Sequence, residues 1–521
     1  MLKNYTSIIF LLCFSTILFS QTPCDESTGM AGIYPCDNYD LMSNIPISVL
    51  ASTNGTPEGS DIWGWTDPLT NKEYAIMATT NSTAFIDVTN PVNPIFLGRI
   101  ESTNNSSSFW RDVKVYNNFA FIVADSVGNH GMQIFDLTIL RDGPNPDLTY
   151  TSDPLDGNVA TYTGDNGGLN IGSCHNIVIN ETAATAYLVG CGAANGGPIF
   201  IDISNPLSPI TTGSYSASGY THDAQVITYN GQDTNAEIAG VSSYVGREIL
   251  VAANGATGGG TDKIVLIDVT DKNDPKFIQE VVYPQAGYAH QGWFTDDHRY
   301  YIMGDELDES GLGSNTTTFV FDMLDLDNPV LSSTYVAPFD AIDHNGYVKG
   351  NEFYLANYRA GMRVFDITNI SNTNDANPST PADNNNSMTE IGYFDTYPSS
   401  NSTAFNGAWS IYPYFQSGNI IISDIESGLF VVRESNTLSI PNFQPTNNFT
   451  ISPNPTTSNS TIKGSKDNLI KSIEIYNILG QKVFNKNNIN NETFVLPVKN
   501  FISGVYLIKI NGRITKKLIV K

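Results

Sequence analysis

Four of the six histidines occupy equivalent places in the sequence. Each begins a short strand-like segment and is followed by Asn, Asp or Gln; the four are His175, His222, His290 and His344. Neutral imidazole is a common metal ligand, and an imidazole beside a carboxylate is a proton-sensitive hydrogen-bonding group. If the four segments converge in space, the sequence predicts a cluster of imidazoles that binds a divalent cation or forms a pH-sensitive rim.

The segments that carry these histidines belong to a repeat. A strand that ends in Asp plus an aliphatic residue occurs six times, and a degenerate seventh copy, LFVV, occupies Leu429–Val432. The six copies are Phe85–Val88, Ile134–Leu137, Phe200–Ile203, Leu266–Val269, Val320–Met323 and Val364–Ile367. Repeats of about 40–50 residues made of short strands are typical of propeller blades. We therefore expect an all-β fold, a seven-bladed β-propeller.

The ends of the repeat region suggest how the ring closes. Residues 289–329 show four strands separated by turns, as expected of one blade. The last copy stops one strand short, and an unassigned strand, Ile45–Ser52, precedes the first copy. We expect this strand to complete the last blade, because closure removes exposed edge strands. The alternative is an edge-capping extension.

The predicted blades place polar side chains at one mouth of the central channel. The first strand of a blade lines the channel, so the four histidines should share a mouth, with Arg111 in the same slot of blade two. The second strands end at this face with Asp305, Glu306, Asn357 and Arg359. We expect these side chains to form a ligand-binding site, with a divalent metal on the histidines as one possibility. In the competing interpretation, each histidine only hydrogen-bonds the backbone of the next blade.

Other polar residues have simpler interpretations. His130 and His298 lie in loops outside the repeat and are expected to be solvated, as is the acidic loop 304–315, whose spacing does not match an EF-hand. The Asp of each repeated strand is expected to cap the turn that follows. Five tryptophans could stack on a sugar or simply pack between blades: Trp63, Trp65, Trp110, Trp293 and Trp409.

The N-terminus and the cysteines indicate export. Residues 1–20 read as a signal peptide, with Lys3 before an apolar core that is too short to span a bilayer, and no later segment is a transmembrane candidate. Four cysteines remain after residue 20. We pair Cys24 with Cys36, and Cys174 with Cys191, because the latter two flank adjacent antiparallel strands. Free buried thiols are the alternative.

The charge is unevenly distributed along the chain. Residues 442–521 contain ten lysines, one arginine and three acidic residues, whereas the whole chain carries a net charge of −26. Such an asymmetry marks a domain boundary. The acidic main part argues against nucleic acid as a partner, because affinity for nucleic acid depends on neutralising phosphates.

Two regions resemble known families. FTISPNPT, IEIYNILGQKVF, FISGVYLIKI and KKLIVK occur in order near the C-terminus and closely resemble the type A sorting domain of the Bacteroidota type IX secretion system. This resemblance implies export across the outer membrane by that machinery, removal of the tail, and surface attachment or release.

The repeat region resembles the choice-of-anchor B proteins with LVIVD repeats. The similarity is carried by CHNIVIN, THDAQVITYNG, AHQGWFTDDHRYYIMGDELDE and DHNGYVKGNEFYLANYRAGMRVFDIT. The expected organisation is a signal peptide (1–20), an N-terminal segment with a disulfide (21–44), the propeller (45–434), a linker (435–448) and a β-sandwich-like sorting domain (449–521).

The sequence favours a binding protein over an enzyme. It contains no HExxH, nucleophile elbow, P-loop or Rossmann glycine pattern. We expect a secreted, surface-anchored module that recognises a surface glycan or a protein. The alternative is a metal-dependent hydrolase or lyase that uses the histidines.

Overall fold

The computed structural model describes residues 21–521 except 53–55, 144–148, 151–158, 165–168, 256–260, 372–386, 436–448, 465, 467–468, 478–480, 500 and 512–513. The predicted signal peptide and all but the first residue of the predicted linker lie outside the described residues. The chain divides into two compact units, Met1–Ser435 and Asn436–Lys521.

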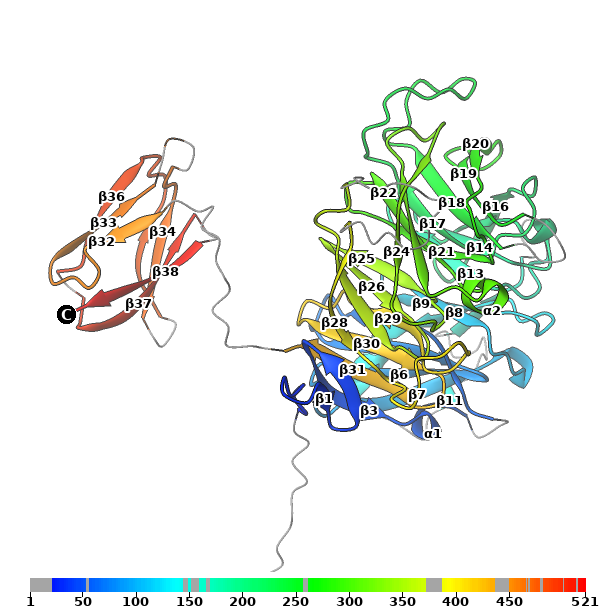
Figure 1. The fold of residues 1–521 in the computed structure, drawn as a ribbon, viewed down its shortest axis with the longest axis horizontal. Helices are drawn as coiled ribbons and strands as arrows, with labels where there is room; N and C mark the ends of the chain where they lie inside the picture. The colour runs from blue at the N-terminus through cyan, green and yellow to red at the C-terminus, as the bar shows by residue number, and fades with distance from the viewer. Residues whose placement is uncertain are drawn as a thin grey trace, which may run out of the picture. The chain divides into compact units, whose positions relative to one another are not determined.

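Among the described residues of the first unit, seven largely antiparallel sheets follow one another along the chain (Figure 1). The first comprises β4 (Gly59–Thr66), β5 (Glu73–Thr79), β6 (Ser82–Asp87) and β7 (Ile95–Glu101), with β11 (Thr149–Tyr150) parallel to β7. The second comprises β8 (Arg111–Tyr116), β9 (Phe119–Ala124), β10 (Met132–Asp136) and β12 (Val159–Tyr162). The third comprises β13 (Asn176–Asn180), β14 (Thr185–Val189), β15 (Ile199–Asp202) and β16 (Ile210–Ser214).

The remaining sheets repeat this order of strands. The fourth comprises β17 (Asp223–Thr228), β18 (Glu248–Asn254), β19 (Lys263–Asp268) and β20 (Lys276–Val281). The fifth comprises β21 (Ala289–Phe294), β22 (Tyr300–Asp305), β23 (Thr317–Asp322) and β24 (Val330–Val336). The sixth comprises β25 (Gly346–Lys349), β26 (Glu352–Ala356), β27 (Met362–Asp366) and β28 (Thr389–Phe394). The seventh comprises β29 (Ala408–Tyr412), β30 (Asn419–Asp424), β31 (Gly428–Glu434) and β3 (Tyr39–Ile45).

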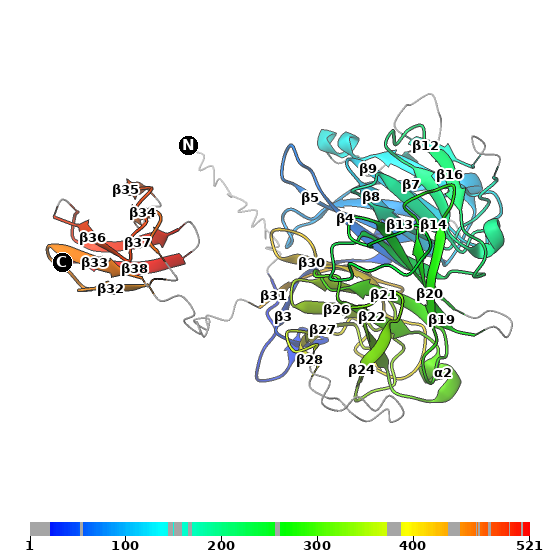
Figure 2. The same cartoon turned by 90° about the horizontal axis from the view of Figure 1, so that it is seen from above.

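The first strands of the seven sheets lie side by side. They contact one another in chain order, β4 with β8 and so on to β29, and β29 also contacts β4. Figures 1 and 2 show the sheets grouped around these strands. Residues far apart in the sequence, at the starts of the sheets, are therefore neighbours in space.

The strand that completes the seventh sheet is not the one predicted. Tyr39–Ile45 (β3) pairs antiparallel with β31, whereas Ile47–Leu50 forms a short helix, α1. The prediction of a strand over Ile45–Ser52 was wrong because Pro46 precedes a helical turn rather than continuing the strand. The preceding strands β1 (Met30–Ala31) and β2 (Tyr34–Asp37) extend the sixth sheet through β28.

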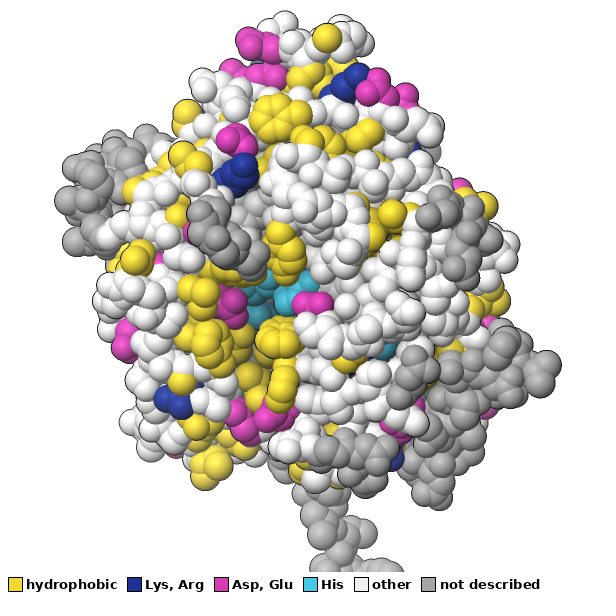
Figure 3. All heavy atoms as spheres, turned by 90° about the vertical axis from the view of Figure 1, so that its right-hand side faces the viewer, with side chains coloured by type: hydrophobic (Ala, Val, Ile, Leu, Met, Phe, Trp, Pro, Cys, Tyr) yellow, Lys and Arg dark blue, Asp and Glu magenta, His cyan; other side chains and the backbone are white. Residues whose placement is uncertain are grey.

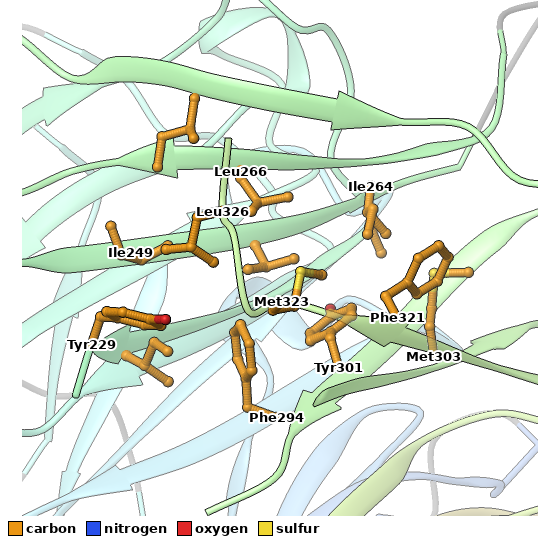
Figure 4. Close-up of a cluster of buried hydrophobic side chains, with 14 of the residues drawn as sticks. Tyr229, Ile249, Ile264, Leu266, Phe294, Tyr301, Met303, Phe321, Met323 and Leu326 are labelled. Carbon is orange, nitrogen blue, oxygen red and sulfur yellow. The ribbon is translucent and has the colours of Figure 1, made fainter. Parts of the chain in front are cut away.

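Apolar residues fill the spaces between neighbouring sheets. Figure 4 shows one such cluster. Tyr229, which follows β17, and Ile249 of β18 pack with Phe294 of β21 and Met303 of β22. The middle strands are rich in Val, Ile, Phe and Tyr, which pack well on a pleated surface. Sheet packing thus holds the first strands in fixed positions.

The repeated aspartates cap turns, as predicted. Oδ1 of each accepts a hydrogen bond from the backbone N–H two residues later; the six are Asp87, Asp136, Asp202, Asp268, Asp322 and Asp366. This Asx geometry satisfies a turn donor without requiring any chemistry at the aspartate.

The short helices connect strands. They are α1, α2 (Asp308–Leu312) and the 3₁₀ turns η1 (Thr103–Asn105), η2 (Leu137–Asp142) and η4 (Ala194–Gly196). Among the described residues, no helix is long and apolar enough to cross a membrane. Both predicted disulfides are confirmed, Cys24–Cys36 and Cys174–Cys191.

The second unit is formed by two small antiparallel sheets. One contains β32 (Thr450–Ser452), β33 (Asn459–Lys463) and β36 (Thr493–Pro497). The other contains β34 (Ile473–Asn477), β35 (Lys482–Lys486), β37 (Gly504–Ile510) and β38 (Ile514–Val520). A shared cluster of buried residues, including Ile462 and Leu496 from one sheet and Ile475 and Ile508 from the other, joins them into a sandwich.

Candidate functional site

Side chains on the first strands tie neighbouring sheets together. The bonds run from one sheet to the next: Asp112 Oδ2 accepts from Ile177 N, Asn176 Nδ2 donates to the His222 carbonyl, Gln225 Oε1 accepts from Phe294 N, and Gln291 Oε1 accepts from Gly346 N. A buried main-chain group is costly to leave unpaired, so these bonds fix the register between sheets. They also fix the residues at the starts of these strands.

The four histidines form a continuous row. Their ring centroids are 4.3 Å apart for His175 and His222, 4.3 Å for His222 and His290, and 4.2 Å for His290 and His344. The row continues to the Trp409 ring, 4.7 Å from that of His344. Figure 3 shows histidine side chains at the bottom of a hollow, with acidic and hydrophobic side chains around them.

Hydrogen bonds to carbonyl groups fix the tautomer of two of these imidazoles. Nδ1 of His222 donates to the carbonyl of His290 at 3.0 Å, and Nδ1 of His344 donates to the carbonyl of Trp409 at 2.6 Å. Nδ1 of His175 lies 3.0 Å from Asp125 Oδ2. A carbonyl only accepts, so in the neutral rings of His222 and His344 the proton is on Nδ1 and the lone pair is on Nε2. In these two rings one nitrogen bonds to the backbone of the next sheet, while the other remains able to bind.

Glu306 lies against the middle of the row. Its Oε2 is 3.7 Å from His290 Nε2, and its Oε1 is 3.8 Å from His344 Nε2. Tyr358 donates its hydroxyl to Glu306 Oε1 at 2.9 Å, which orients the carboxylate. His290 is 1% exposed, and its Nδ1 has no hydrogen-bond partner. One ligand atom from each of His222, His290 and Glu306 lies within 4.8 Å of the other two.

Burial controls the charge of these groups. It lowers the pKa of His222 and His290 well below the usual value, and that of His344 to about 4. It raises the pKa of Glu306 to about 7, against the opposing effect of the Tyr358 hydroxyl. Neutral imidazoles are the form that binds metal ions, so the buried row is suited to metal ligation.

A pocket of about 480 Å³ opens beside the row. Its described lining combines aromatic rings with carboxylates and contains neither lysine nor arginine: Glu58, Gly59, Phe109, Trp110, Glu306, Tyr358, Phe405, Asn406, Trp409, Ile425 and Glu426. Phe109, Trp110 and Phe405 are 52%, 44% and 50% exposed, which is unusual for side chains of this size and leaves ring surface available to a ligand.

The other predicted site residues do not join the row. Asp305 is buried and accepts from Tyr283 and two backbone amides, and Asn357 donates to the carbonyls of Ala341 and Ile342. Arg359 donates to Asn406, a pocket residue, and so supports the rim. Arg111 is 1% exposed and donates to Ser102. Its guanidinium is buried, and Arg111 is not among the described residues that line the pocket.

Particular side chains in two loops that were expected to be solvated are buried. His130 is fully buried, and burial lowers the pKa of its imidazole to about 3. In the acidic loop, Asp308 and Glu309 are 1% and 3% exposed. Both belong to α2, which follows β22, and Glu309 lies near Asp343. The expectation of solvation was wrong for these three side chains, whereas residues 310–313 of the acidic loop are exposed. His298 is partly buried, with its ring stacked on that of Tyr229.

The tryptophans divide into two groups. Trp63, Trp65 and Trp293 pack against tyrosines inside the unit. Only Trp110 and Trp409 line the pocket. Two of the five tryptophans are therefore placed where they could stack on a sugar, and the other three pack against tyrosines.

Sequence reasoning missed Tyr358, which orients Glu306. The residue has a φ of 32°, a conformation that L-residues seldom adopt and that is often found at functional sites. Its position between Asn357 and Arg359, at the end of a second strand, was the available signal. Phe109, Phe405 and Glu58 were missed because they lie outside the first and second strands.

Comparison with known proteins identifies two segments. Residues 450–521 match the secretion system C-terminal sorting domain, and residues 192–217 match the LVIVD repeat. No curated protein matches the chain.

Similar solved structures share little sequence with this chain. PorZ, an essential surface component of the type IX secretion system of Porphyromonas gingivalis, has 12% identity over 87% of this chain with a TM-score of 0.43, and this chain spans 58% of that one. The β-propeller domain of Cps50 (Swd1) from Myceliophteria thermophila has 9% identity over 74% of this chain and 99% of its own, with a TM-score of 0.41. A hypothetical selenium-binding protein from Sulfolobus tokodaii has 12% identity over 67% of this chain and 86% of its own, with a TM-score of 0.41.

The C-terminal match fixes where the protein acts. A type IX sorting domain implies contact with that secretion machinery and indicates secretion with attachment to the cell surface. The chain is therefore a secreted surface protein that carries an LVIVD repeat and a C-terminal sorting domain.

Proposed function

We propose that the chain is a seven-bladed β-propeller of the choice-of-anchor B type, displayed on the cell surface as a binding module. The contacts of β29 with β4 and the pairing of β3 with β31 support ring closure. The proposed organisation keeps the predicted signal peptide, linker and sorting domain. The propeller, however, begins near residue 30, because β1, β2 and β3 belong to its sheets.

The proposed binding site is the pocket beside the histidine row. The composition of the pocket lining carries this proposal. The described lining residues include five aromatic side chains and three glutamates, and none of them is a lysine or an arginine. Aromatic faces attract cations, and a carboxylate adds a favourable charge. The chain also carries a net charge of −26, which concentrates cations near its surface. A small organic cation, such as a quaternary ammonium or a substituted amine, fits these features best.

A surface glycan remains the second ligand class, because Trp110 and Trp409 could stack on a sugar ring. The two classes differ in their response to salt. Attraction between a cation and carboxylates weakens as ionic strength rises, whereas stacking on a neutral sugar changes little.

The experiment is a calorimetric titration of the secreted chain with tetramethylammonium, choline and neutral oligosaccharides at 20 and 500 mM NaCl. We expect saturable binding of the cations that weakens with salt and is lost in Trp110→Ala. The matched control is Trp65→Phe, since Trp65 stacks on Tyr74 away from the pocket lining. Salt-independent binding of a sugar would replace the cation assignment by the glycan one, and absence of binding by all probes would contradict the proposal.

A metal-dependent hydrolase or lyase is the second candidate function. The close approach of His222, His290 and Glu306 favours it. Catalysis would require a metal ion at these residues and a substrate in the pocket, so metal binding is the first requirement of this alternative.

A further inference from the structure

We propose that His222, His290 and Glu306 form a binding site for one transition-metal dication, such as Zn²⁺ or Cu²⁺, at the bottom of the pocket. The metal site shares Glu306 with the proposed binding pocket, but it does not depend on which organic ligand the pocket takes, because neither imidazole belongs to the described pocket lining.

The geometry supports a shared ion. The three ligand atoms lie within 4.8 Å of one another. A tetrahedral zinc ion with bonds of about 2.1 Å holds its ligand atoms about 3.4 Å apart, so the side chains need to move inward by about an ångström. Backbone hydrogen bonds hold two of the three residues, from His222 N to the Ala253 carbonyl and from Glu306 N to the Tyr288 carbonyl, so this movement falls to the side chains.

The polar atoms around the site also point to an ion. The buried His290 Nδ1 has no partner, although buried polar nitrogens are normally hydrogen-bonded. The Nδ1 of His222 already donates to a carbonyl, which is the usual way in which a protein orients a metal-binding imidazole. Tyr358 holds Glu306 in the same manner. His222 and Glu306 are thus each held by a hydrogen bond, and His290 has a buried ring nitrogen without a hydrogen-bond partner.

The ligand types select the class of metal. Two imidazole nitrogens and one carboxylate suit zinc or copper, whereas calcium and magnesium prefer oxygen ligands alone. His344, whose Nε2 is 3.8 Å from Glu306 Oε1, is the nearest additional ligand. The pocket beside Glu306 leaves room for water or a ligand at a remaining coordination position.

A second group of carboxylates provides a contrast. Asp233, Asp325 and Asp327 also approach one another, but they offer only oxygen atoms. All three already accept hydrogen bonds, Asp233 from Leu326 N, Asp325 from Asp327 N and Asp327 from the Tyr244 hydroxyl. This group serves as the internal control for non-specific binding of cations.

The test uses the full secreted chain, stripped with a chelator and titrated separately with Zn²⁺ and Cu²⁺ by calorimetry. We expect one equivalent to bind to the histidine site. Changes to groups that merely orient metal ligands weaken metal binding by about 10–100-fold. Removing a direct ligand in His290→Ala or Glu306→Gln should therefore weaken it by at least about 100-fold. Two control variants, His298→Gln and Asp325→Asn, should bind like the parent.

A second measurement separates ligand loss from misfolding. The Cu²⁺ complex of the parent should show nitrogen hyperfine splitting in its electron paramagnetic resonance spectrum, and this splitting should be reduced in His222→Ala. Circular dichroism of each metal-free variant checks that it folds. Metal binding that is unchanged in all three ligand variants, or absent from the folded parent, would overturn the proposal.

Discussion

Lys114→Met should strongly destabilise the first unit. Lys114 lies on β8 with its Nζ 3.0 Å from Asp61 Oδ2 and 2.5 Å from Asp112 Oδ1, and over the Trp63 ring at 4.8 Å. All three ionisable side chains are buried. Although burial disfavours the ammonium, the two carboxylates raise the pKa of Lys114 well above its usual value, so it remains charged.

The expected loss of stability follows from this geometry. Two opposite charges 3.0 Å apart attract by about 5 kcal/mol at an effective dielectric constant of about 20. Removing one partner of a buried pair costs about 3–5 kcal/mol, because the other charge stays buried and unpaired. The methionine keeps most of the side-chain volume, so loss of packing adds little. We expect Lys114→Met to lower the free energy of unfolding by about 3–5 kcal/mol.

The assay is urea unfolding followed by tryptophan fluorescence. Asp61→Asn combined with Lys114→Met should be less destabilising than Lys114→Met alone, since the double variant leaves no unpaired Asp61 charge. The control is Lys263→Met, which breaks the more exposed pair with Glu280 and should cost less than about 1 kcal/mol. A loss below about 1 kcal/mol for Lys114→Met would refute the buried ion cluster and, with it, the convergence of the first strands.

Three further predictions concern other parts of the first unit. Burial raises the pKa of Asp424 and Asp395 from 3.8 to about 6, so the folded chain retains protons that the unfolded chain releases. These two carboxyl groups therefore contribute stability that falls as pH rises from about 4 to about 6, whereas the buried neutral histidines contribute with the opposite sign. Asp424→Asn should remove its share of the fall, so the difference in melting temperature between parent and variant should change over this range; a difference that stays constant would contradict the assignment. Deleting residues 21–45 removes β3 and exposes the edge of β31, so the shortened chain should associate with increasing concentration in light scattering, whereas a monodisperse product would argue against closure by β3. Replacing Cys174 and Cys191 by serine removes a disulfide with a sequence separation of 17. The free energy of unfolding, measured with denaturant, should fall by about 3 kcal/mol. An unchanged unfolding midpoint would show that the disulfide is dispensable.

The repeated elements could be predicted from the sequence because each copy satisfies the same local requirement. Strands that end in Asp before a turn read alike in every copy, and all six aspartates cap the turn that follows. The closing strand was misplaced because Ile45–Ser52 is rich in apolar residues, whereas the residues after Pro46 form a helical turn and the pairing strand lies just before it.

The histidine row could be predicted for the same reason. Equivalent slots in consecutive repeats become neighbours when the sheets share one axis, so His175 to His344 lie together. Arg111 occupies a similar slot yet is buried away from the pocket lining, because what covers a side chain depends on the loops of the neighbouring sheet. The aromatic wall of the pocket, including Phe405, comes from loops without a repeat pattern, and no sequence signal identified it.

The most direct test of the account is a crystal structure of the secreted chain soaked with Zn²⁺, with anomalous diffraction recorded at the zinc edge. We expect one strong anomalous peak within about 2.2 Å of nitrogen atoms of His222 and His290 and of an oxygen of Glu306, beside the aromatic pocket that Glu306 lines. A structure in which the four imidazoles lie on separate surfaces, or in which zinc binds only elsewhere, would contradict it.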